Sequence, residues 1–162
     1  MQIALYQPDI PQNTGTIARL CACVGSPLHI IEPAGFDVSD RNFRRAGMDY
    51  AERAAIVRHA SWTAFEEWRR EAGARLLLAT TRAAESYLDW SYAPSDILLL
   101  GRESAGVPEI VHEAADARLL IPMLSGLRSL NVAVAAAMIL GEGLRQTGGF
   151  AMAAAEARNA AS

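Results

Sequence analysis

The sequence predicts an α/β fold in which helices flank a parallel sheet, and two observations carry this prediction. Short apolar runs bounded by glycine, proline or charged residues recur along the 162 residues, and they are nearly continuous, as strands covered on both faces are. Segments with helical periodicity lie between them, and strands that alternate with helices favour a parallel sheet. A chain of this length buries roughly 70% of the surface that its unfolded form exposes, so a single core is expected.

The elements follow from these patterns in order. The first helix is expected after the cap signal Asn13-Thr14, and Gly25 is expected to end it. Strands are expected at residues 3–6, 28–31, 76–79, 97–100 and 119–121, with a weaker candidate at 55–57, and further helices at 61–72, 108–114 and 129–146. No repeat or linker divides the chain, so we expect one domain over residues 1–150. An alanine-rich tail follows over residues 151–162, either as a helix or as a frayed end.

Composition excludes several classes of protein. The chain is 51% hydrophobic and 20% charged, which is unlike a disordered or collagen-like chain. Cys21 and Cys23 are two positions apart, a spacing that suits neither a CxxC motif nor a disulfide, so reduced thiols are expected. No apolar run reaches the length of a membrane span, and the first residues lack the basic start of a secretion signal. These features predict a soluble, cytoplasmic protein without a membrane partner.

The charges are unevenly distributed along the chain. A formal net charge of −3 argues weakly against a nucleic-acid partner. All fifteen cationic residues are arginines, however, and residues 41–58 hold five arginines against two acidic residues, which makes this segment +3 and the remainder −6. A solvated helix face is one interpretation of such a run. A surface for RNA phosphates is the other, because the arginine fork matches phosphate geometry.

Polar residues follow the expected strands at the places where parallel sheets bind ligands, beyond the carboxyl ends of the strands. Thr80-Thr81-Arg82 follows the strand at 76–79, and the segment 101–106 follows the strand at 97–100 with a glycine at each end. Glycine permits close approach of the backbone to a ligand. The second loop lacks the Lys-Ser/Thr pair of an NTPase phosphate loop, and the chain has no G-x-G-x-x-G. Ordinary polar turns are the alternative interpretation of both loops.

A third loop and the first helix add further candidates. Arg128, Ser129 and Asn131 precede the long apolar helix. Capping explains Ser129 or Asn131 but not all three residues, whose hydrogen-bonding groups are costly if left unpaired. Arg19 lies opposite the apolar stripe of the first helix and leans toward Gly15, because helical side chains tilt toward the N-terminus. An exposed surface arginine is the alternative.

Together, these segments resemble the three ordered motifs of the SPOUT class of RNA ribose methyltransferases, over nearly the whole chain. The matching segments are Asn13-Thr14-Gly15 with Arg19, residues 100–107, and residues 121–123 with 129–133. Residues 28–33, 44–50 and 58–59 are similar to the TrmL branch of that class. The resemblance implies transfer of a methyl group from S-adenosylmethionine to the ribose 2′-oxygen of the wobble nucleotide, cytidine or modified uridine at position 34, in leucine tRNAs.

The resemblance also implies structure that the residue pattern does not predict. It implies a deep C-terminal trefoil knot in the parallel sheet, although knots are rare among folds, and it implies a homodimer. S-adenosylmethionine would be held in the knot, with no metal taking part. The implied cofactor-binding residues are Ala79, Thr80, Gly101, Ile121, Met123, Ser129 and Leu130.

The implied catalytic residues are Arg19, Asn13, Glu103, Ser129 and Asn131. In the family the arginine is the proposed acceptor of the hydroxyl proton, but a guanidinium is normally always charged, so Arg19 can instead orient the phosphate and stabilise the forming alkoxide. Ser129 and Asn131 would hold the loop and the ribose, Asn13 would support the first helix, and Glu103 would order the second loop. The implied surface for a tRNA anticodon stem-loop consists of Arg19, Arg41, Arg44, Arg45, Arg58 and Arg128.

Other functions remain compatible with the sequence. The same chemistry could act on another tRNA or rRNA site, or the chain could be a knotted RNA-binding module without catalysis. A small-molecule nucleotide-binding α/β protein is the third hypothesis. The histidines His29, His59 and His112 lie outside the three motifs, so ordinary core or surface roles are expected for them.

Overall fold

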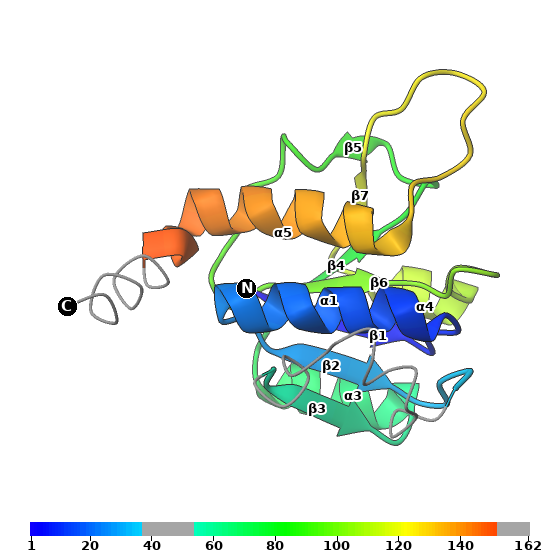
Figure 1. Ribbon diagram of the computed structural model, residues 1–162, viewed down its shortest axis with the longest axis vertical. Helices are drawn as coiled ribbons and strands as arrows, with labels where there is room; N and C mark the ends of the chain where they lie inside the picture. Colours follow the sequence, from blue (N-terminus) through cyan, green and yellow to red (C-terminus); the bar gives the residue numbers. More distant parts are fainter. Residues whose placement is uncertain (37–53, 152–162) are drawn as a thin grey trace.

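A computed structural model describes residues 1–36 and 54–151. Its elements are, in chain order, β1 (Gln2–Tyr6), α1 (Pro11–Val24), β2 (Leu28–Ile31), β3 (Ile56–His59), α3 (Trp62–Glu71), β4 (Leu76–Ala79), β5 (Glu85–Ser86), β6 (Ile97–Leu100), α4 (Glu109–Ala114), β7 (Ala117–Leu120) and α5 (Val132–Thr147). The strands form one seven-stranded sheet in the order β3-β2-β1-β6-β4-β7-β5 (Figure 1). Every pairing between these strands is parallel, which confirms the expected fold class.

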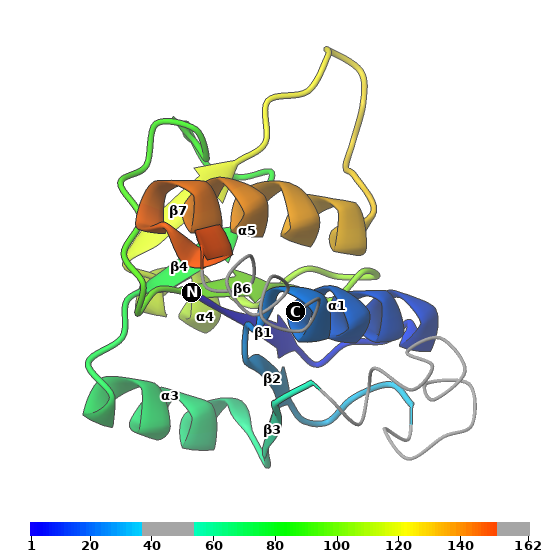
Figure 2. The ribbon, with the colours of Figure 1, turned by 60° about the vertical axis from the view of Figure 1, so that its left-hand side comes forward.

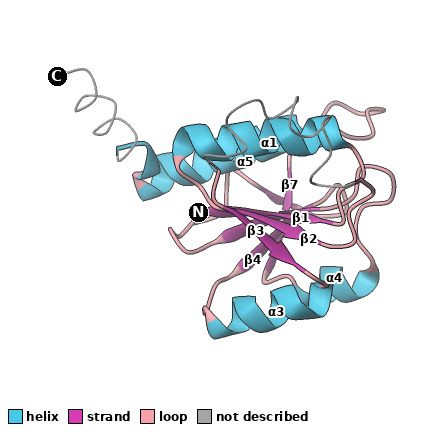
Figure 3. Cartoon of the chain, turned by 60° about the horizontal axis from the view of Figure 1, so that its bottom comes forward, coloured by secondary structure: helices cyan, strands magenta, loops and turns pink. Residues whose placement is uncertain are grey.

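Helices cover both faces of the sheet. Figure 3 shows α1 and α5 on one face and α3 and α4 on the other. Successive strand residues point to opposite faces, so Leu98 and Leu100 join the core beneath α1 and α5, whereas Ile97 and Leu99 join the core beneath α3 and α4. All four are buried. This two-sided burial is why the strands read as continuous apolar runs.

The helix ends differ in part from those expected. Helix α1 begins at Pro11, after Ile10, so the prediction of a start at Asn13-Thr14 is wrong. Proline suits the first helical position because its missing N–H is one that the helix leaves unbonded anyway. The expected end at Gly25 is confirmed, since this residue adopts a left-handed conformation with φ 70°. Helix α3 lies one residue inside each end of the expected range 61–72, and Ser61 caps it by accepting a hydrogen bond from the N–H of Ala64.

Helix α5 begins three residues later than expected. Asn131 caps it by accepting hydrogen bonds from the N–H groups of Ala133 and Val134, so Ser129 belongs to the preceding loop. Strand β7 starts at Ala117, two residues before the expected start, and ends before Ile121. The two-residue strand β5 was not expected. The long loop between β7 and α5 projects away from the sheet (Figure 2).

Several expectations fall outside the described residues. Residues 37–53 and 152–162 are not described, and they include most of the alanine-rich tail as well as Arg41, Arg44, Arg45 and Arg53. The domain boundary at residue 150 and the trefoil knot stay predictions. Among the helices that the structure describes, none is long and apolar enough to cross a membrane.

Candidate active site

A cavity of about 530 Å³ opens at the carboxyl ends of the central strands, in the size range of small-molecule sites. Segments that follow β1, β6, β4 and β7 all contribute to it, because these four strands are neighbours in the sheet. The cavity is lined by every residue expected to hold a cofactor: Ala79, Thr80, Gly101, Ile121, Met123, Ser129 and Leu130. Four of the five expected catalytic residues, Asn13, Glu103, Ser129 and Asn131, also line it.

A chain of hydrogen bonds joins three of these catalytic residues. Asn131 accepts from the first N–H groups of α5 and donates its amide N–H to Oδ1 of Asn13 at 3.0 Å. Asn13 in turn donates from Nδ2 to Oε1 of Glu103 at 3.1 Å. Each amide therefore has one orientation, because its oxygen and its nitrogen have different partners. The start of α5, the first turn of α1 and the loop after β6 are thus held together at the edge of the cavity.

Asp9 is a site residue that the sequence reasoning missed. Its backbone N–H donates to Oε2 of Glu103 at 3.2 Å, and its Oδ1 accepts from the backbone N–H of Glu103 at 3.2 Å. The hydroxyl of Ser104 donates to its other carboxylate oxygen. Gln7, with φ 44°, turns the chain at the end of β1 into the left-handed region that non-glycine residues rarely adopt. This turn lies two residues before Asp9, where the chain passes from β1 toward α1.

The two carboxylates influence each other's ionisation. The contact with the Glu103 side chain, followed by that with Ser104, lowers the pKa of Asp9 below its ordinary value. Burial, followed by the contact with Asp9, raises the pKa of Glu103. Asp9 is therefore the carboxylate that keeps its charge as the pH falls, and Glu103 takes up the first proton.

The loop after β6 closes tightly on itself. Arg102 and Gly106 exchange two backbone hydrogen bonds, of 3.0 Å and 2.8 Å. A Cβ on Gly101 would lie 2.7 Å from the carbonyl carbon of Gly106, closer than carbon atoms approach without a shift of the backbone. The glycine at position 101 is thus required by this closure, which presents Arg102 and Glu103 to the cavity.

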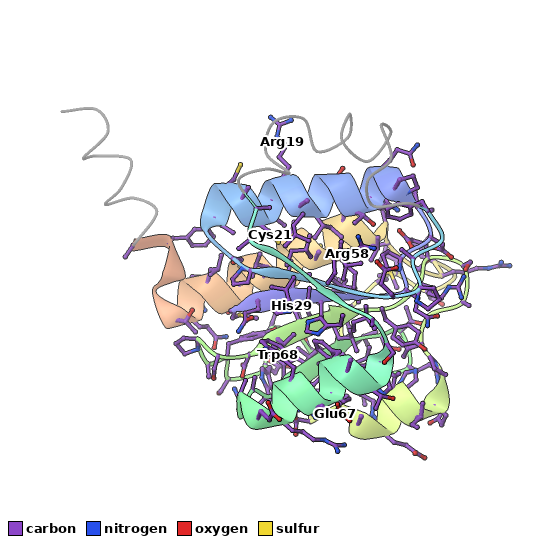
Figure 4. All side chains as sticks on the ribbon, turned by 90° about the horizontal axis from the view of Figure 1, so that it is seen from below. Arg19, Cys21, His29, Arg58, Glu67 and Trp68 are labelled. Atoms are coloured by element: carbon purple, nitrogen blue, oxygen red, sulfur yellow. The ribbon has the colours of Figure 1, made fainter. Side chains whose placement is uncertain are left out.

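Of the arginines predicted to bind RNA, the three that the structure describes lie outside the cavity lining. Arg19 is exposed on α1, and Figure 4 shows it pointing away from the sheet. Arg128 is exposed in the loop before α5. Arg58 pairs with Glu32, with 2.6 Å between Nη2 and Oε1. Arg19 and Arg128 are absent from the described residues that line the cavity.

The histidines have different surroundings. His29 and His59 are buried beside Phe65 and Trp68 and are 2.9 Å apart between Nδ1 and Nε2. Burial lowers the pKa of His29 to about 4, and it also lowers the pKa of His59. Both are core residues, as expected. His112 is buried as well but lines the cavity, which the sequence did not predict.

Comparison with known proteins places this geometry in a family. The model of the SpoU rRNA Methylase family matches residues 1–141. The chain belongs to the SpoU methylase family. This confirms the resemblance to SPOUT methyltransferases.

Two curated relatives match nearly the full chain of this SpoU methylase. One from Ancylobacter novellus is 66% identical over 151 residues, 93% of this chain and 96% of the relative. Another from Escherichia coli K12 is 42% identical over 150 residues, 91% and 94% of the two chains. Both are named tRNA (cytidine(34)-2′-O)-methyltransferase.

Two solved structures share the fold. One, described as giving structural insights into the 2-OH methylation of C/U34 on tRNA, has a TM-score of 0.85 and 41% identity, covering 90% of this chain and 94% of its own. A second is the SpoU methyltransferase AviRb from Streptomyces viridochromogenes with AdoMet bound, with a TM-score of 0.83 and 29% identity over 90% of this chain and 60% of its own. Within the described residues, no group of three or more potential ligands is arranged to hold a metal ion.

Proposed function

We propose that this protein transfers a methyl group from S-adenosylmethionine to the ribose 2′-oxygen of the wobble nucleotide, cytidine or modified uridine at position 34, of tRNA. The observation that carries the proposal is one cavity lined by both residue sets, the seven expected cofactor residues and four expected catalytic residues. Relatives named tRNA (cytidine(34)-2′-O)-methyltransferase match more than nine tenths of the chain. A preference for leucine tRNAs, a cytoplasmic location and recognition of the anticodon stem-loop are further predictions.

The cavity suits a nucleoside with a charged amino-acid end. Ile121, Met123 and Leu130 supply apolar walls, whereas Thr80 and Glu103 supply polar groups, the mixture typical of cofactor sites. When bound, S-adenosylmethionine supplies an electrophilic methyl group. The residues at the strand exits would hold its nucleoside part.

The residues of the chain would then position the acceptor ribose, because methyl transfer to a hydroxyl depends on the alignment of the reacting atoms. Asn13 and Asn131 each use one amide N–H within the site, which leaves a second N–H of each for the ribose or its phosphate. Ser129 would contribute its hydroxyl. Arg19 would hold the phosphate next to the ribose and stabilise the negative charge that develops on the 2′-oxygen.

We propose that the protein acts as a homodimer. Val134 and Met138, four residues apart on one face of α5, are 49% and 38% exposed, and the preceding loop exposes Leu124 and Leu127 at 81% and 66%. A second copy would remove these apolar side chains from water. Since Arg19 is outside its own cavity lining and points away from the sheet (Figure 4), it would act on RNA bound at the cavity of the partner.

The dimer proposal has two tests. Exchanging both Val134 and Met138 for glutamate should give a monomer in analytical ultracentrifugation while the fold is kept. Mixing an Arg19→Ala protomer with an Asn131→Ala protomer should restore part of the activity that each homodimer lacks. A mixture that stays inactive would remove the shared site.

The decisive test of the reaction is mass spectrometry of tRNA nucleosides from cells that lack and regain the gene. Loss and return of one 2′-O-methylated nucleoside at position 34 would support the proposal. Return of a methyl group at another tRNA or rRNA position would redirect it. Purified protein that binds tRNA but leaves the methyl donor untouched would favour an RNA-binding module, and indifference to RNA would favour a small-molecule function.

Arg19→Ala separates the two parts of the mechanism. We expect this variant to lose methyl transfer while it keeps its affinity for S-adenosylhomocysteine, because Arg19 lies outside the cavity lining. Turnover with labelled S-adenosylmethionine and calorimetry measure the two effects. Unchanged turnover would contradict the role of Arg19.

A further inference from the structure

We propose that Arg102 binds an oxyanion of the ligand at the cavity, an inference that rests on the proposed methyl transfer. Arg102 directly follows Gly101, lines the cavity, and its side chain is 39% exposed. The oxyanion belongs either to the RNA phosphate beside the acceptor ribose or to the carboxylate of the methyl donor. Both are planar or forked acceptors that a guanidinium recognises in the same way.

The bonding of Arg102 differs from that of most arginines of the described chain that pair with acids, since these donate a hydrogen bond to a carboxylate: Arg58, Arg69, Arg75, Arg82 and Arg145. Arg70 pairs with Glu66 at 3.3 Å, but its side chain is 72% exposed. Nε of Arg102 is buried without a hydrogen-bond partner, and the nearest carboxylate oxygen recorded, Oδ2 of Asp9, is 3.6 Å away. Arg102 is therefore held near an opposite charge without being saturated by it.

Asp9 is already engaged by other donors. Its Oδ1 accepts from the backbone N–H of Glu103, and its Oδ2 accepts from the hydroxyl of Ser104. The charge of Asp9 thus anchors the Nε edge of Arg102 from one side. No acceptor within the described part of the chain is recorded for the two terminal nitrogens of this guanidinium, so they can donate to a ligand.

The backbone that carries Arg102 is also fixed in advance. Arg102 exchanges two backbone hydrogen bonds with Gly106, and the backbone of Gly106 packs directly against Gly101. Glu103, the next residue, accepts from Asn13 of the catalytic chain. An oxyanion on Arg102 would therefore lie next to the reacting groups, and the loop backbone would lose little conformational entropy when it binds.

The test compares Arg102→Met and Arg102→Lys with the wild type, and Arg118→Met serves as the matched control. Arg118 is an exposed arginine of β7 outside the cavity lining, so its removal changes the net charge equally without touching the site. Affinities are measured by calorimetry for S-adenosylhomocysteine and for 5′-methylthioadenosine, which lacks the amino-acid part. The affinity for tRNA is measured as a function of salt.

Each arm has a distinct expected result. If the donor carboxylate is the ligand, Arg102→Met weakens S-adenosylhomocysteine about tenfold to a hundredfold, as one charge-assisted hydrogen bond predicts, and leaves methylthioadenosine unchanged. If the phosphate is the ligand, both nucleosides bind normally, whereas tRNA binds about tenfold more weakly with a smaller salt slope. Arg102→Lys should recover part of either loss, because it keeps the charge and loses the fork.

Three results would overturn the inference. One is wild-type affinity of Arg102→Met for all three ligands, and another is an equal loss for both nucleosides, which indicates a distorted loop. The third is an effect of Arg118→Met as large as that of Arg102→Met. If Arg102→Met does not fold, Arg102→Lys carries the same comparisons. A wild-type protein that binds these ligands but does not methylate tRNA would contradict the proposed function alone, and one that binds none contradicts both.

Discussion

The chain of amides at the cavity predicts a pH-dependent penalty for Asn13→Asp. This substitution keeps the size of the side chain and the oxygen that accepts from Asn131. It replaces Nδ2 of Asn13, which donates to Oε1 of Glu103 at 3.1 Å, with a second carboxylate oxygen. Two unit charges at that distance repel by about 5 kcal/mol at an effective dielectric constant of about 20. A pair of carboxylates this close cannot both stay ionised without cost, so the pair takes up a proton.

The sign of the pH dependence follows from this proton. The folded variant holds one carboxyl pKa above its unfolded value, so the folded state binds more protons than the unfolded state and its stability falls as the pH rises. Burial already raises the pKa of Glu103 in the wild type, and the substitution adds to that rise. We expect a destabilisation of about 1 kcal/mol or less at pH 5 and about 2 to 3 kcal/mol at pH 8, with each unit of pKa shift worth about 1.4 kcal/mol.

Urea denaturation at pH 5, 6, 7 and 8, followed by circular dichroism, measures this difference against the wild type at each pH. Asn13→Ala is the matched control, since it removes the same hydrogen bonds without adding a charge, and its penalty should change little with pH. An equal loss of unfolding free energy for Asn13→Asp at pH 5 and pH 8 would refute the reasoning. It would mean that the carboxylate of Glu103 does not repel a charge at position 13.

Three other perturbations follow from the structure. Gly101→Ala would place a Cβ 2.7 Å from a backbone carbon of its own loop. We expect about 1 to 3 kcal/mol of strain and at least about tenfold weaker binding of S-adenosylhomocysteine. An unchanged affinity in calorimetry would contradict this prediction. Asp96→Asn removes the charge of a fully buried carboxylate that accepts two hydrogen bonds from Arg75, whose side chain is 42% exposed. We expect a cost of about 1.5 to 3 kcal/mol in urea denaturation, as hydrogen bonds to charged groups predict, and a loss under about 0.5 kcal/mol would contradict this. The lowered pKa values of His29 and His59 mean that the folded state binds fewer protons. Wild-type stability should therefore fall as the pH drops from about 6.5 toward about 4, and replacing both histidines by glutamine should flatten that slope.

Features set by local pattern were predictable from the sequence. The strand at 97–100 could be recognised because all four of its residues are buried, on two faces. Gly25 marks the end of α1 because a left-handed cap favours glycine. The position of the cavity was predictable too, since residues after neighbouring parallel strands meet at one edge, although His112 in its lining was not.

Features set by distant contacts were not predictable. Asp9 bonds to Glu103 across 94 positions of the chain, and nothing in the neighbouring sequence distinguishes it from a turn residue. The start of α5 was placed too early because Ser129 and Asn131 are both good caps. Asn131 is the cap in the structure, and its amide also donates to Asn13, 118 positions away, a contact that the local sequence does not reveal.

The position of the site follows from where the connections of the sheet diverge. Strand β6 lies between β1 and β4. The chain leaves β1 for α1 on one face and leaves β6 for α4 on the other (Figure 3), and a crevice forms where neighbouring parallel strands send their connections to opposite faces. Divergence opens the cavity but also separates the residues that must act together. The hydrogen bonds of Glu103 with Asp9 and Asn13 connect the two sides of the crevice. A shift of α1 relative to β6 would therefore displace Glu103 directly. The geometry for methyl transfer thus depends on these few polar contacts as well as on packing.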